Sequence, residues 1–144
     1  MVGLYAGSFN PFHKGHYDIL GKAMDIFDEV IVGVGVNSQK DCKGQNIIIA
    51  NELRLKLPNN IVMPYRTLLT DFITLLEKEY GSVVLVRGLR NATDLAYEQN
   101  LYSFLKDIKP DIRIVSLFCD VEYLHYSSSG IKSLPVELQQ KYLI

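Results

Sequence analysis

Cysteine is scarce in this sequence, which contains only Cys42 and Cys119 among its 144 residues. These two are too few and too far apart for a disulfide framework or a zinc knuckle, so we expect reduced thiols in a cytoplasmic protein. An excess of positive charge is also lacking, and a formal net charge of −1 argues against a broad nucleic-acid-binding surface. No apolar run approaches the roughly 20 residues of a membrane-spanning helix, and no leader opens the sequence. We therefore expect a soluble protein without a membrane or nucleic-acid partner.

The apolar content is sufficient for one hydrophobic core. Hydrophobic residues make up 48% of the sequence and charged residues 22%. A chain of 144 residues with this balance fits one compact domain. We expect a single domain over residues 1–144, without repeats, linkers or low-complexity segments.

The stretch LYAGSFNPFHKGH, at residues 4–16, changes character halfway along. An apolar run stops at Ala6 and gives way to glycine, serine, asparagine and proline, which predicts a strand ending in a turn. Apolar residues at helical spacing follow and predict a helix that begins close to His16. His13 and His16 would then face the same space as the free N–H groups of that helix, which suits an anion such as phosphate. By itself, a pair of histidines near a helix start is more often a surface feature than a catalytic one.

Apolar runs and helical patterns alternate along the chain. Strands are predicted at residues 2–5, 30–36, 61–63, 83–86 and 112–118, and helices at about 16–27, 46–57, 70–80, from 94 onward and at 135–143. Thr70 is expected to cap the third helix and Gly81 to end it. Continuously apolar strands joined through helices predict an α/β protein: a Rossmann-like, doubly wound, parallel five-stranded sheet with helices on both faces. Ligands bind such folds at the carboxyl ends of the strands.

Charged side chains follow two of these strands. Lys40 lies in a polar loop after the second strand, and the sequence RGLR places Arg87 and Arg90 after the fourth. A lysine in a polar loop is usually solvated, but its place near a strand end gives Lys40 weight. For the arginines we favour phosphate binding over structural ion pairs. Asp94 and Glu98 could complement the dipole of the following helix or hold the two arginines in place.

Two further segments have alternative interpretations. Three consecutive serines, Ser127, Ser128 and Ser129, could form a flexible turn, or could cap a short helix and offer hydroxyl and N–H groups to phosphate oxygens. Leu68 and Leu69 are more simply explained as core residues, although before a helix at a strand end they could wall a pocket.

Taken together, these segments resemble a known family. The string GSFNPFHKGH is similar to the HxGH signature of the nucleotidyltransferase superfamily, whose members attack the α-phosphate of a nucleoside triphosphate and release pyrophosphate. Four anchors, at residues 6–16, Lys40, 86–98 and 126–132, resemble the phosphopantetheine adenylyltransferases. The pattern RGLRxxxDxxYE is the most discriminating of them. The resemblance implies transfer of AMP from ATP to 4′-phosphopantetheine, giving dephospho-coenzyme A and pyrophosphate.

The resemblance also implies roles for individual residues. His16 would stabilise the pentacovalent α-phosphate, with Lys40 and Arg90 as further catalytic groups. Substrate-binding positions would be Ser8, Lys40, Leu69 and Arg87. ATP-binding positions would be Ser8, Phe9, His16, Gly88, Leu89, Arg90, Glu98, Tyr123, Leu124, His125, Tyr126, Ser127, Ser128 and Ser129. Mg²⁺ bound through the ATP phosphates and a homo-hexamer are implied as well, with no metal site formed by the protein itself.

Some positions depart from the family pattern and keep alternatives open. Asn10 and His13 replace residues usual in the family, and a histidine at position 13 is typical of the nicotinate-mononucleotide and cytidylyl branches. A nucleotidyltransferase with another acceptor is therefore the first alternative. The second is a catalytically silent nucleotide-binding homologue. Because no activated serine or cysteine nucleophile stands out, we expect direct in-line attack without a covalent enzyme intermediate.

Overall fold

The computed structural model describes residues 1–36 and 44–144. The predictions for Lys40 and Cys42 fall in the segment between these ranges and lie outside the described residues.

The described residues form a parallel sheet with the strand order β3-β2-β1-β4-β5. Its strands are β1 (Val2–Gly7), β2 (Glu29–Val34), β3 (Ile61–Pro64), β4 (Val83–Leu89) and β5 (Ile114–Phe118). The predicted five-stranded parallel sheet is thereby confirmed. Because β1 lies in the middle, its carboxyl end meets the ends of β2 and β4, where the strand order reverses and ligands bind in such folds.

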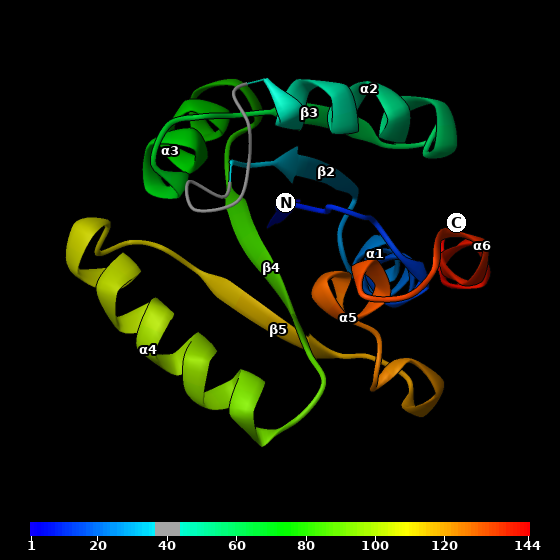
Figure 1. Ribbon diagram of the computed structural model, residues 1–144. Helices are drawn as coiled ribbons and strands as arrows, with labels where there is room; N and C mark the ends of the chain where they lie inside the picture. Colours follow the sequence, from blue (N-terminus) through cyan, green and yellow to red (C-terminus); the bar gives the residue numbers. More distant parts are fainter. Residues whose placement is uncertain (37–43) are drawn as a thin grey trace.

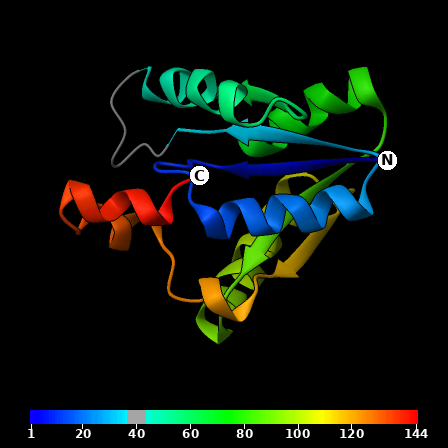
Figure 2. The same cartoon turned by 90° about the vertical axis from the view of Figure 1, so that its right-hand side faces the viewer.

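Helices cover both faces of the sheet (Figures 1 and 2). Ile19 of α1 (Lys14–Ile26) and Ala50 of α2 (Gln45–Lys56) pack into the core on one face. Phe72 of α3 (Leu69–Tyr80) and Leu105 of α4 (Ala92–Ile108) pack into the core on the other. Short helical turns follow β5: η1 (Val121–Tyr123), α5 (Ser128–Lys132), α6 (Val136–Gln139) and η2 (Gln140–Tyr142). The predicted α/β fold with helices on both faces is confirmed.

Side chains of the central strands alternate between the two cores. Val32 and Val86 are completely buried beneath α1 and α2, whereas Leu4, Ile31 and Leu85 are completely buried on the face of α3 and α4. Each buried side chain of this size contributes about 1.5–3 kcal/mol of hydrophobic stabilisation. The double burial explains why these strands are apolar at every position instead of at alternate ones.

Several element boundaries differ from the predicted ones. Helix α1 begins at Lys14, because His13 and not a later residue caps it. Strand β4 continues through Arg87 to Leu89, because its ladder with β5 extends past the apolar run: Arg87 pairs with Ser116. The first arginine of the RGLR sequence is therefore a strand residue rather than a loop residue.

The predicted cap of α3 is wrong. The helix begins at Leu69 with Leu68 at the cap position, and Thr70 lies inside its first turn. Thr70 is only 3% exposed, and its hydroxyl has no hydrogen-bond partner in the described part of the chain. Gly81 ends the helix as predicted, with a φ of +81° that favours glycine. The single helix predicted for residues 135–143 is instead divided between α6 and η2.

Candidate active site

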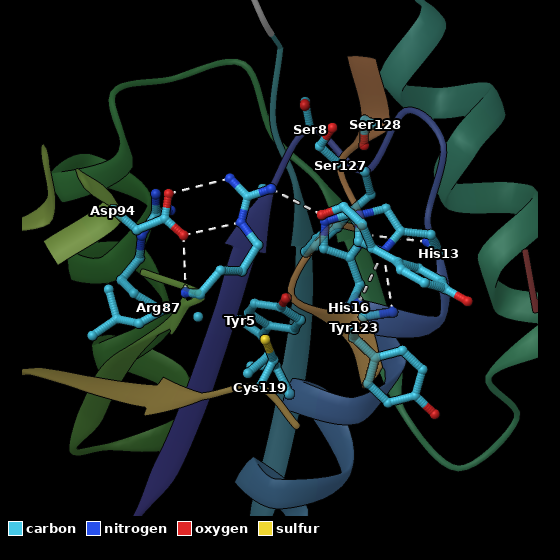
Figure 3. Close-up of a pocket in the computed structure, with 18 of the residues that line it drawn as sticks. Tyr5, Ser8, His13, His16, Arg87, Asp94, Cys119, Tyr123, Ser127 and Ser128 are labelled. Carbon is cyan, nitrogen blue, oxygen red and sulfur yellow. Dashed lines mark hydrogen bonds and ion pairs between the residues drawn. The ribbon is translucent and has the colours of Figure 1, made fainter. Parts of the chain in front are cut away.

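A cavity of about 410 Å³ opens at the carboxyl ends of β1 and β4 (Figure 3). His16 and Arg90, which are far apart in the sequence, both line it. Its lining also includes other residues singled out from the sequence, namely Ser8, Phe9, His13, Arg87, Gly88, Leu89, Asp94, Glu98, Tyr123, Tyr126, Ser127 and Ser128. The structure therefore brings the HxGH segment, the RGLR segment and the serine segment together at one site.

His13 and His16 cap the start of α1 through reciprocal hydrogen bonds. His13 Nδ1 accepts from the backbone N–H groups of Gly15 (3.1 Å) and His16 (3.3 Å), and His16 Nδ1 accepts from the N–H of His13 (3.1 Å). In a neutral imidazole whose Nδ1 accepts, Nε2 carries the proton. Both rings therefore have a fixed tautomer, with Nε2–H as the remaining hydrogen-bond donor.

Both imidazoles are held in the neutral form. Burial, and secondly the charge of Arg90, lowers the pKa of His13 to about 4. Burial also lowers the pKa of His16 well below its usual value, with His13 and Arg90 adding to the effect. The two rings stack with their centroids 3.7 Å apart, an arrangement that two charged rings would oppose. His16 can thus donate a hydrogen bond to a phosphate oxygen without first requiring a proton from solvent.

The buried cap makes the stability of the protein depend on pH. His13 has a pKa of about 4 when folded and about 6.5 when unfolded, so the unfolded state binds more protons between these values. The contribution of the neutral His13 side chain to the free energy of unfolding is therefore present above pH 6.5 and is lost as the pH falls toward 4. Between pH 7 and pH 5 the loss is about 2 kcal/mol. We expect His13→Thr, which keeps an N-cap oxygen, to show a smaller difference in the free energy of unfolding between urea titrations at these two pH values. An unchanged difference would contradict this assignment.

Aromatic rings surround His16 and fix its plane. The centroids of Phe9 and Phe12 lie 5.1 Å and 5.3 Å from that of His16, and Tyr5 lies 6.5 Å away. Phe9 is buried and has a φ of +49°, in the left-handed region that non-glycine residues rarely adopt. Strain of this kind persists only where the surrounding structure holds it, and it clusters at functional sites.

Arg90 is locked in place beside the histidines. Its Nε and Nη2 donate to the Asp94 carboxylate (2.9 and 3.2 Å), and its Nη1 donates to the carbonyl oxygen of Tyr126 (2.9 Å). Asn91 caps α4 by accepting from the N–H of Asp94 (3.0 Å), which holds the carboxylate near the arginine. The guanidinium is therefore a fixed positive charge that also anchors the segment leading into α5.

Arg87 makes a second bidentate ion pair. Its Nε and Nη2 donate to the two oxygens of Glu98, both at 2.9 Å, and its Nη1 donates to the carbonyl oxygen of Ala6 (3.2 Å). Both partners are mostly buried, with side-chain exposures of 22% and 13%. The alternative that acidic residues of α4 hold the two arginines in place is confirmed. The nucleotide-binding role predicted for Glu98 is untested, but its carboxylate is directed to Arg87.

The serine segment contributes one wall of the cavity. The Ser127 hydroxyl caps α5 by accepting from the N–H of Gly130 (3.0 Å), as the capping alternative predicts. The Ser128 hydroxyl donates to the carbonyl oxygen of Pro11 (2.9 Å) and so joins this segment to the turn after β1. The Tyr126 ring also contacts the His13 ring, with centroids 5.8 Å apart, so the serine segment is joined to the start of α1 as well.

Among the residues that the structure describes, four predicted site residues do not line the cavity. Leu124, His125 and Ser129 are exposed next to it, and the His125 ring packs against Tyr126 with a centroid distance of 4.9 Å. Leu69 lies in the first turn of α3 and packs partly buried against the core. Their binding roles remain predictions.

Other lining residues were not singled out from the sequence. Tyr5 is a buried strand residue whose sequence context resembles that of any core position, and burial raises its pKa. Cys119 is half-buried in the cavity wall one residue after β5, and burial raises the pKa of its thiol. Its place after a strand was the signal that could have identified it. Tyr97, the tyrosine of the RGLRxxxDxxYE pattern, was noted in the sequence without a role of its own. It also lines the cavity and follows Asp94 by less than one turn of α4.

Among the described residues, no group of three or more histidine, cysteine or acidic side chains is placed to hold a metal ion. In the same part of the chain, every helix is too short or too polar to span a membrane.

A family model described as cytidylyltransferase-like matches residues 4–134. This match, which covers most of the chain, makes the protein a nucleotidyltransferase, a class that agrees with the fold and the cavity. In structure, the chain is similar to a putative nicotinate-nucleotide adenylyltransferase from Vibrio parahaemolyticus, with a TM-score of 0.64, 12% identity, and coverage of 91% of this chain and 77% of that one. At this identity the likeness supports the fold alone.

Sequence comparison is more specific. The chain is 36% identical over 137 residues to a phosphopantetheine adenylyltransferase from Streptococcus pneumoniae and 35% identical over 138 residues to one from Clostridium tetani. Each match covers 92% of this chain and 82% of the relative. The chain belongs to the phosphopantetheine adenylyltransferase family, as the resemblance of its motifs implied.

Proposed function

We propose that this protein transfers the adenylyl group of ATP to 4′-phosphopantetheine, giving dephospho-coenzyme A and pyrophosphate. The observation that carries the proposal is the convergence of His16 and Arg90 on one cavity at the carboxyl edge of the sheet. A neutral hydrogen-bond donor and a fixed cation at one site match a reaction in which negative charge is redistributed over phosphate oxygens. The family relationship supports the choice of ATP and 4′-phosphopantetheine as substrates.

In the proposed mechanism, an oxygen of the acceptor phosphate attacks the α-phosphorus of ATP. The new P–O bond forms as the bond to the bridging oxygen of the β-phosphate breaks, and pyrophosphate leaves with that electron pair. His16 Nε2–H donates to the α-phosphate oxygen, and Arg90 offsets charge on the departing pyrophosphate. Arg87, with Lys40, orients the acceptor. The protein acts by positioning and charge stabilisation.

Further binding roles are part of the proposal. The turn with Ser8 and Phe9, the strand residues Gly88 and Leu89, and the segment from Tyr123 to Ser129 would enclose the nucleotide. Leu69 would contact the acceptor. These roles are supported by the shared cavity where the residues line it, and by family resemblance elsewhere.

Mg²⁺ would enter the site with the ATP phosphates. Asp94 and Glu98, the acidic residues that line the cavity, are both occupied by arginines. The residues therefore fit a metal that is held by the nucleotide and not by protein ligands. When bound, the ion would neutralise charge on the triphosphate.

A cytoplasmic homo-hexamer of single-domain subunits completes the proposal. Supporting an oligomer, α4 exposes apolar side chains along its length, including Leu95, Phe104 and Ile108. Exposed apolar residues gathered on one helix are typical of interaction surfaces.

Pyrophosphate release is the measurement that tests the proposed reaction. Purified protein with ATP and Mg²⁺ is expected to release pyrophosphate only when 4′-phosphopantetheine is added. Nicotinate mononucleotide as acceptor, and CTP in place of ATP, are the matched controls for the related nucleotidyltransferases. Turnover with one of these controls but not with 4′-phosphopantetheine would contradict the proposed acceptor or nucleotide, and nucleotide binding without any release would contradict catalysis.

A further inference from the structure

Arg87 and Tyr65 lie on the same face of the sheet. Leu85 of β4 packs into the core beneath α3 and α4, and Arg87 is two residues further along that strand, so it projects from the same face. Tyr65 follows β3, and its ring packs against the same core. The two side chains therefore approach the carboxyl edge of β1 from opposite sides, on the face away from α1.

The end of β1 lies between them. Arg87 Nη1 donates to the carbonyl oxygen of Ala6. The N–H of Gly35 donates to the carbonyl oxygen of Gly7 (2.9 Å). Tyr65 lies directly over Gly35, because a Cβ on this glycine would be 2.7 Å from the tyrosine hydroxyl oxygen. Gly7 itself lines the cavity. Tyr65 follows β3, two strands from β1, and lies just outside the lining of the cavity. Its hydroxyl nevertheless extends over Gly35, which is bonded to the end of β1, so the phenol and the guanidinium both lie at this edge.

The Tyr65 ring has a rigid position. It stacks on Phe72 of α3 with centroids 4.4 Å apart and planes 11° from parallel. The Tyr65 N–H donates to the carbonyl oxygen of Val34 (3.0 Å), and its own carbonyl oxygen accepts from Asn46 Nδ2 (3.1 Å). Ring and backbone are thus both fixed, and little entropy remains to be lost when a ligand binds.

The hydroxyl of Tyr65 has no hydrogen bond to another residue within the described ranges, and its side chain is half-buried. Burial raises its pKa, and the charge of Arg87 acts in the opposite direction. At neutral pH the phenol is protonated.

We propose that the Tyr65 hydroxyl is a specificity-determining donor to the phosphorylated acceptor, opposite Arg87 at the carboxyl edge of β1. The inference rests on the proposed function and adds an acceptor-binding residue to it. Arg87 would supply charge, and Tyr65 a directional hydrogen bond to a phosphate or adjacent oxygen. ATP would be bound on the other side of this edge, next to His16 and the serine segment.

Tyr65→Phe tests the hydroxyl without removing the ring. Loss of one hydrogen bond to a charged group is expected to raise the KM for 4′-phosphopantetheine about tenfold. The KM for ATP, the kcat at saturating acceptor and the Tm should remain within error of the wild type, because the stacking on Phe72 is retained. Tyr102→Phe is the matched control, since Tyr102 is exposed on α4, and all its parameters are expected to be unchanged.

The outcomes distinguish the inference from the proposed function. An acceptor KM within twofold of the wild type in Tyr65→Phe would overturn the inference, as would equal increases in the KM of acceptor and ATP or a lower Tm. If the wild type itself shows no turnover with 4′-phosphopantetheine, the proposed function fails, whatever the Tyr65 variant does.

Discussion

His16→Ala is expected to lower kcat by about 10²–10³-fold, the cost of removing one preorganised donor from a transition state. The Kd for ATP should change little, because a hydrogen bond that strengthens as charge develops contributes to turnover more than to ground-state binding. The structure makes the effect specific: the tautomer of His16 is set by its bond from the His13 N–H, so Nε2–H is the one donor lost. Single-turnover kinetics together with ATP titration would measure the two quantities separately.

The capping role of His16 requires its own control. Its Nδ1 accepts a backbone hydrogen bond at the start of α1, so alanine also removes part of the cap. Asparagine can offer an oxygen near Nδ1 but has no donor at the reach of Nε2, whereas glutamine can extend an amide N–H to that distance. We expect His16→Asn to keep the stability and lose the turnover, and His16→Gln to recover part of the turnover. Turnover within tenfold of the wild type in His16→Ala would remove His16 from the mechanism.

The sequence was most informative where one strand ends and a helix begins. The turn after Ala6 and the apolar spacing after His16 predicted a strand, a turn and a helix, and the structure has all three. Such local signals follow from backbone chemistry, because glycine and proline favour turns and the period of apolar residues identifies the element. The convergence of His16 and Arg90 could also be predicted, since parallel strands end at a common edge.

Pairings between distant side chains could be predicted only as alternatives. The sequence left open whether Glu98 complements a helix dipole or holds an arginine, and it did not indicate the bidentate pair with Arg87, which depends on how α4 packs against β4. The mutual capping of His13 and His16 likewise depends on ring orientations and not on their spacing alone. Thr70 has the residue type of a helix cap, but the helix had already begun at Leu69, and tertiary packing placed the hydroxyl in the interior.

Arg87→Ala is expected to raise the KM for the acceptor about 100-fold and to lower the free energy of unfolding by about 3 kcal/mol. The first effect follows from the loss of charged hydrogen bonds to a phosphate. The second follows because Glu98, 13% exposed, would be left as a buried and unpaired charge. Steady-state kinetics with varied acceptor, together with urea unfolding, would measure both effects.

Variants at Glu98 separate binding from stability. In the double variant Arg87→Ala with Glu98→Gln, the buried charge is gone, so we expect much of the stability to return while the acceptor KM stays high. Recovery of the acceptor KM in that variant would mean that Arg87 acts only by neutralising Glu98. Glu98→Gln alone should weaken the hold on Arg87 and raise the acceptor KM several-fold without changing the KM for ATP. The opposite pattern, a change in the KM for ATP alone, would assign Glu98 to the nucleotide, because a carboxylate that only positions Arg87 can affect only what Arg87 binds.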